Sequence, residues 1–181
     1  MALEPRDTPE RYGLVSRALH WSMAALFAWQ FLGMILKKLA EDSAAATFIR
    51  GTHSSIGALL FLLVVIRAVW AFSNRRERPA HGTGLLGRAA AAGHFALYAL
   101  MIIAPALALL RAYGSGRGLN FLGMAQIIPA TGTRIDWMVA PASALHGNLS
   151  WLLLALIVGH ITMVFVHRDL LRDNTMAKMA G

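Results

Sequence analysis

The sequence contains no cysteine and few charged residues, and each shortage excludes a class of protein. Without cysteine the chain cannot form disulfides, hold an iron–sulfur cluster or attach haem through thioethers. Only 14% of its 181 residues are charged, whereas about 25% is usual in soluble domains. Hydrophobic residues make up 57% of the chain. This composition predicts an integral membrane protein whose net charge of +8 faces membrane lipid rather than nucleic acid.

Four apolar runs are long enough to cross a bilayer, which takes about 20 residues in a helix. We expect spans at about residues 17–36, 51–72, 88–113 and 141–168, with Pro141 at the first helical position. The loop at 114–140 is the longest and could hold a short surface helix. The predicted fold is all-α: a four-helix transmembrane bundle in which residues 1–181 form one integral membrane domain.

Lysine and arginine residues near the spans predict the orientation. One side has ten of them: Arg6, Arg11, Arg17, Arg75, Arg76, Arg78, Arg88, Arg168, Arg172 and Lys178. The other side has six: Lys37, Lys38, Arg50, Arg111, Arg117 and Arg134. We therefore expect both termini on the cytoplasmic side of the membrane. Only Arg67 lies within a span, and its side chain can snorkel to the interface.

The fourth span contains three histidines, a residue type that is rare inside membranes and suggests function there. His146 and His160 are 14 residues apart. That spacing gives about 21 Å of helical rise and places both rings within about 40° of one helix face. One helix thus offers two imidazoles to the bundle interior, one near each membrane surface. His167 continues the same stripe at the membrane edge.

Because successive spans run in opposite directions, the other histidines match these two depths. His20 opens the first span on the cytoplasmic side with His160, and His53 opens the second on the outer side with His146. Two imidazoles on opposite faces of one iron are what bis-histidine haem requires. A single histidine inside a membrane is about as often a hydrogen-bonded core residue as it is a ligand. Four of them at two depths, with one helix supplying both, predict two b-type haems.

The segments around the histidines also show a resemblance: SRALHW, RGTHSSIG, AAGHFALYAL, SALHGNLS and GHITMVFVHRDLLRDNTM. In order and spacing they resemble the bacterial cytochrome b561 family, whose close relatives include superoxide oxidase. The resemblance implies a four-helix bundle holding two b-type haems. It assigns His20 and His160 to the cytoplasmic-side haem iron, and His53 and His146 to the outer one.

The same resemblance implies electron transfer between the membrane faces and quinone. In the superoxide oxidase branch, superoxide donates its electron on the outer side and ubiquinone accepts it. His167 matches a family position near the quinone, and His81 matches a basic residue of the second connection, so both are candidate quinone contacts. Ala25 stands where that branch has a hydroxyl near the quinone, and this chain has none there. The basic outer loops would attract a small anion such as superoxide.

Two other functions remain open at this point. The chain could be a haem anchor subunit that passes electrons to or from a soluble dehydrogenase or hydrogenase partner, with the 114–140 loop as docking surface. It could instead use its histidines to bind a transition metal or carry protons, although they lack the carboxylate or cysteine companions common at such sites. His94 is left over once the other four histidines are paired, and it is interpreted as a structural or propionate-contacting residue.

Overall fold

The computed structural model describes residues 4–41, 43–80, 82–173 and 175–180. Its elements are α1 (Leu14–Leu39), α2 (Ala44–Ser73), α3 (Gly84–Gly114), β1 (Leu119–Phe121), β2 (Ala125–Ile128), α4 (Asp136–Phe165), the π-helical turn η1 (Val166–Leu171) and α5 (Thr175–Ala180). Within these ranges, four helices are long and apolar enough to cross a membrane. The predicted all-α four-helix fold is confirmed.

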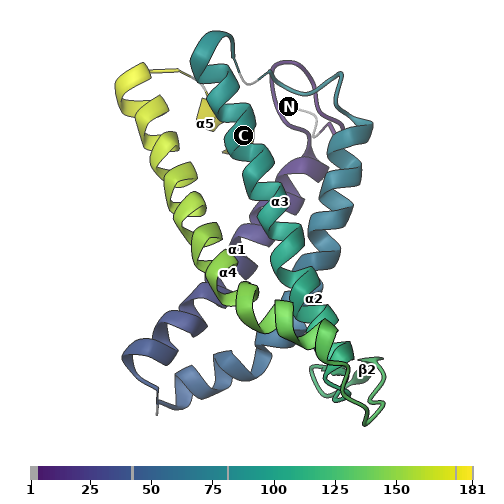
Figure 1. Cartoon of the computed structure of the whole chain (residues 1–181). Helices are drawn as coiled ribbons and strands as arrows, with labels where there is room; N and C mark the ends of the chain where they lie inside the picture. The colour runs from purple at the N-terminus through teal and green to yellow at the C-terminus, as the bar shows by residue number, and fades with distance from the viewer. Residues whose placement is uncertain (1–3, 42, 81, 174, 181) are drawn as a thin grey trace.

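The four long helices form two antiparallel hairpins (Figure 1). Helices α1 and α2 pair closely, α3 and α4 pair closely, and α2 also packs against α3. Glycine allows the close approaches: a β-carbon at Gly33 would lie 2.6 Å from Ile49 Cγ2, and one at Gly114 would lie 2.5 Å from Met138 Cβ. The N- and C-terminal segments share one end of the bundle, and the β1–β2 hairpin lies at the other (Figure 1).

The buried core lies among α1, α2 and α3 rather than at the centre of all four helices. Its fully packed residues are Met23, Leu60 and Val64, and Tyr98 and Met101 of α3 pack against them. Helix α4 is apolar over its whole length, yet among its residues only Val139, Ala142 and Leu153 are buried. The helix that carries two of the paired histidines therefore packs mainly along α3 and leaves most of its surface uncovered.

The helices are longer than the apolar runs, because polar and small residues extend them beyond the predicted ends. Helix α4 begins at Asp136, so the expectation that Pro141 starts the fourth helix is wrong, and Pro141 lies inside it. Asp136 favours the earlier start, since a carboxylate in the first turn stabilises the positive end of the helix. Pro141 lies close to that end, where its missing N–H removes only one backbone hydrogen bond.

The connection between α3 and α4 contains a β-hairpin and not the short surface helix that the sequence suggested. Strands β1 and β2 pair antiparallel, with Phe121 opposite Ala125. Gly118 has a positive φ of 70°, and a β-carbon there would collide with the backbone of Ile128. The Ser55 hydroxyl of α2 accepts a hydrogen bond from the Leu122 N–H at 3.0 Å, which ties the hairpin to the bundle.

The polar segment before α1 is folded onto the bundle by one buried carboxylate. Asp7 accepts hydrogen bonds from the Gly13 N–H and the Ser16 hydroxyl, both at 2.9 Å. Its side chain is fully buried and lies 3.3 Å from Nε of Arg78 in an ion pair. Burial beside this cluster raises the pKa of Tyr12 above its ordinary value. Asp7 thus joins the start of α1 to the connection between α2 and α3.

Replacing Asp7 with alanine should destabilise the protein by about 3 kcal/mol, because it leaves Arg78 without its partner and removes two further hydrogen bonds. Thermal unfolding of the purified protein in detergent measures the loss. Glu10→Ala is the matched control, since Glu10 is an exposed carboxylate of the same segment. Equal melting temperatures for the two variants would contradict this role of Asp7.

Candidate functional site

Near the end of the bundle that holds the β-hairpin, α2 and α4 bring two histidines together. The ring centres of His53 and His146 are 6.2 Å apart and their planes are inclined at 85°. Nδ1 of His146 lies 2.9 Å from the Ala104 carbonyl of α3. Because a carbonyl can only accept, Nδ1 carries the proton and Nε2 of the neutral ring keeps a free lone pair. Gln30 of α1 contacts α2 beside this pair, since its Nε2 donates to the His53 carbonyl at 3.0 Å.

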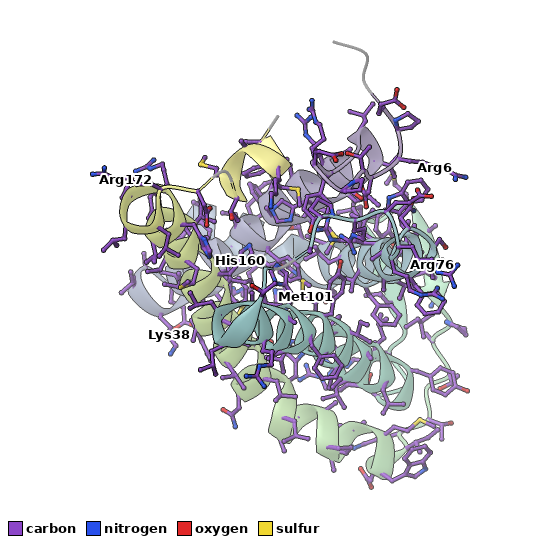
Figure 2. All side chains as sticks on the ribbon, turned by 90° about the horizontal axis from the view of Figure 1, so that it is seen from above. Arg6, Lys38, Arg76, Met101, His160 and Arg172 are labelled. Atoms are coloured by element: carbon purple, nitrogen blue, oxygen red, sulfur yellow. The ribbon has the colours of Figure 1, made fainter. Side chains whose placement is uncertain are left out.

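A second pair lies toward the opposite end of the bundle, between α1 and α4. The ring centres of His20 and His160 are 6.3 Å apart, with an interplanar angle of 68°. In the view along the bundle, His160 lies near the middle and Arg172 at the edge (Figure 2). His94 of α3 adds a third imidazole, whose ring centre is 5.3 Å from that of His160. Its Nδ1 donates to the Ala90 carbonyl at 2.8 Å.

Both pair distances fit two imidazoles that share one iron. A histidine nitrogen binds a transition metal at about 2.0 Å and lies about 1.2 Å from the ring centre, so two opposed rings have centres about 6.4 Å apart. The observed 6.2 and 6.3 Å match this separation, whereas the 5.3 Å between His94 and His160 is too short. Within the described ranges, no three histidine or acidic side chains gather closely enough to hold a bare metal ion.

The two candidate quinone residues have different outcomes. His81 lies outside the described residues. His167 lies in η1, where its Nδ1 is 2.6 Å from Oδ2 of Asp173. The pKa of Asp173 is lowered to about 2 by hydrogen bonds from Thr175 and from His167. His167 is therefore held by a carboxylate that stays ionised at neutral pH, a contact that the sequence analysis did not anticipate.

Arg67 differs from its sequence interpretation. It does not snorkel to the surface but is only 9% exposed. Its Nε donates to the Tyr98 hydroxyl at 3.0 Å, and its Nη1 donates to the Ser16 carbonyl at 2.9 Å. Tyr98 and Ser16 belong to neighbouring helices, so the guanidinium is held inside the bundle rather than extended toward water. An arginine in an apolar run was the only signal in the sequence for this buried charge.

Comparison with known proteins shows the family to which the chain belongs. The model of the prokaryotic cytochrome b561 family matches residues 11–181. The chain belongs to this family. It is 33% identical to cytochrome b561 homolog 2 of Escherichia coli (strain K12), and the match covers 97% of this chain and 94% of that protein. As a member of the cytochrome b561 family, the chain is a multi-pass bacterial membrane protein that binds haem b and transfers electrons.

In this b561-family chain, replacing His94 with phenylalanine should leave the haem content and the low-spin absorption spectrum unchanged. The ring of His94 is too close to that of His160 to oppose it across an iron, and phenylalanine keeps most of the packing volume. The pyridine haemochrome assay and the reduced-minus-oxidised spectrum measure the outcome. Loss of one haem, or a high-spin band, would show that His94 is a ligand.

Proposed function

We propose that the protein is a membrane cytochrome b with two haems that carries electrons between a donor at the outer face, of which superoxide is the best candidate, and membrane ubiquinone. The observation that supports this most strongly is the pairing of His20 with His160 and of His53 with His146 at opposite ends of α4. A b-type haem held by each pair would supply one-electron transfer at that depth. The whole chain, residues 1–181, serves as one domain for this purpose.

The chain contributes the spacing and the preorganisation of the ligands. On α4 the two ligand histidines are separated by about 21 Å of helical rise, which covers most of a bilayer core of about 30 Å. The buried Leu153 lies midway between them in sequence and keeps the path apolar. The hydrogen bond from His146 to Ala104 fixes the tautomer that leaves Nε2 available to iron.

The proposed orientation places both termini in the cytoplasm. The N- and C-terminal segments lie at the same end of the bundle, as an even number of spans requires (Figure 1). That end carries ten of the basic residues outside the spans and the other end carries six, in the sense of the positive-inside rule. His20 and His160 then form the cytoplasmic pair, and His53 and His146 the outer pair.

At the outer face, the cations differ in their availability to an anionic donor. Arg50 pairs with Glu41 at 3.9 Å, and Arg134 pairs with Asp136 at 2.7 Å. Arg111 is exposed and lies close enough to His53 to act on its ring electrostatically. An arginine beside the outer pair would concentrate a small anion such as superoxide there. Arg111 is therefore the cation of greatest interest for the donor.

At the cytoplasmic face, His167 and Asp173 supply the proton chemistry that quinone reduction needs. Asp173 orients the His167 ring through its 2.6 Å contact at Nδ1. An imidazole held in this way can pass a proton to the oxygen of a reduced quinone. His81 remains a proposed second contact on the basis of its place in the sequence.

The ligand assignment predicts that His53→Ala and His160→Ala each lose about one haem of two and keep the other. Each replacement removes one axial imidazole from one pair and leaves the second pair about 21 Å away along α4. Haem per protein after purification gives the result, with His94→Phe as control. A variant that retains both haems in low-spin form would contradict the assignment.

Arg111→Gln should lower the rate of superoxide-dependent ubiquinone reduction several-fold at low ionic strength and have a smaller effect at high salt. Arg134→Gln is the matched control, because Arg134 is exposed on the same side but already paired with Asp136. Absence of any superoxide-dependent quinone reduction in the haem-replete protein would exclude superoxide as the donor. Co-purification of a stoichiometric soluble partner would then favour the anchor-subunit function.

A further inference from the structure

Arg67 is a buried positive charge without an anionic partner among the described residues. Its two hydrogen-bond partners, the Tyr98 hydroxyl and the Ser16 carbonyl, are neutral groups. They engage Nε and Nη1, and within the described ranges Nη2 makes no hydrogen bond to a protein group. A guanidinium that is only 9% exposed inside an apolar bundle loses several kcal/mol of hydration unless an anion compensates it.

The one buried carboxylate among the described residues, that of Asp7, already has other partners. Asp7 accepts hydrogen bonds from Gly13 and Ser16 and pairs with Arg78 at 3.3 Å. The other ion pairs within the described ranges join exposed or half-exposed residues, and none of them includes Arg67. The chain therefore neutralises Arg78 with its own aspartate and leaves Arg67 for a group that is not part of the protein.

The position of Arg67 indicates where that group lies. Arg67 is near the end of α2, and it is close enough to the rings of both His20 and His160 to act on them electrostatically. Tyr98 and Ser16 hold the guanidinium from α3 and α1, so its direction is set by two neighbouring helices. An anion that compensates Arg67 would thus lie beside the cytoplasmic-side histidine pair.

We propose that Arg67 binds a carboxylate of the group held between His20 and His160, and so both anchors the cytoplasmic-side haem through a propionate and raises its reduction potential. This inference rests on the proposed ligation by that pair. Arginine suits the task because its planar fork donates two parallel hydrogen bonds to a carboxylate. A positive charge close to an iron centre stabilises the reduced state, which carries one positive charge fewer. The anionic oxygen of a reduced quinone has similar chemistry, and the experiment separates the two sources.

The test uses the haem-replete protein purified free of quinone. Arg67→Met removes the charge and keeps much of the side-chain volume, whereas Arg67→Lys keeps the charge and loses the fork. Arg88→Met is the matched control, because Arg88 is an exposed arginine in the first part of α3 at the same end of the bundle. The readouts are the two midpoint potentials from a spectroelectrochemical titration and the rate of haem transfer to apomyoglobin.

We expect Arg67→Met to lower the midpoint potential of one haem and to speed its release about ten-fold, the factor that corresponds to about 1.4 kcal/mol. The second haem and the Arg88→Met protein should be unchanged, and Arg67→Lys should keep most of the potential. Unchanged potentials and release rates in Arg67→Met would overturn the inference. An effect that develops only when quinone is added back would assign the anion to quinone and would also overturn it.

Two further outcomes separate this inference from the ligand assignment. If Arg67→Met does not accumulate, Tyr98→Phe replaces it: loss of the hydroxyl that holds Nε must speed release of the same haem, and an unchanged rate contradicts the inference. If His160→Ala loses one haem while Arg67→Met leaves both potentials unchanged, only the role of Arg67 fails. If His160→Ala keeps both haems, the proposed ligation itself fails.

Discussion

Each of two imidazoles on α4 lies opposite an imidazole of another helix at the same depth, and the rest of the site depends on these two pairings. The two imidazoles of α4 belong to His146 and His160, which are separated by about 21 Å of helical rise. The ring centre of His53 in α2 lies 6.2 Å from that of His146, and the ring centre of His20 in α1 lies 6.3 Å from that of His160. Both separations are close to the value of about 6.4 Å expected for two imidazoles with one iron between them. The two pairings link α4 to α2 near one end of the bundle and to α1 toward the other end.

The packing of the bundle distinguishes the helices that form the buried core from the helix that carries two of the paired histidines. Helices α1, α2 and α3 form the buried core, whereas α4 carries two of the paired histidines and is little covered by protein. At the end of the bundle that holds both chain termini, two arginines differ in the charge of their partners. Arg78 is neutralised by the buried Asp7, but Arg67 has only neutral partners within the described ranges. The pair of His20 and His160 thus lies beside a fixed positive charge, whereas the pair of His53 and His146 has the exposed Arg111 nearby.

Helical periodicity is enough to predict the fold and the pairing of the rings, because the depth of a histidine depends only on its distance from the start of its span. The features that the sequence did not reveal depend on tertiary contacts or on local turns of the chain, which helical periodicity does not encode. The burial of Arg67 requires Tyr98 from α3, and the contact of His167 with Asp173 requires the chain to turn back after η1. The β-hairpin was missed because its strands are only three and four residues long. Pro141 does not mark the start of the fourth helix, since proline is tolerated in the early turns of a helix as well as at its first position.

The electron paramagnetic resonance spectrum of the fully oxidised protein, combined with a haem count, tests the paired-imidazole geometry most directly. The rings of the two proposed ligand pairs have planes inclined at 68° and 85°, which is close to perpendicular, and such an arrangement would give low-spin ferric haem a highly anisotropic signal. The account predicts two such low-spin signals of equal intensity and two haems per chain. A high-spin signal of comparable intensity, or a single haem per chain, would contradict it.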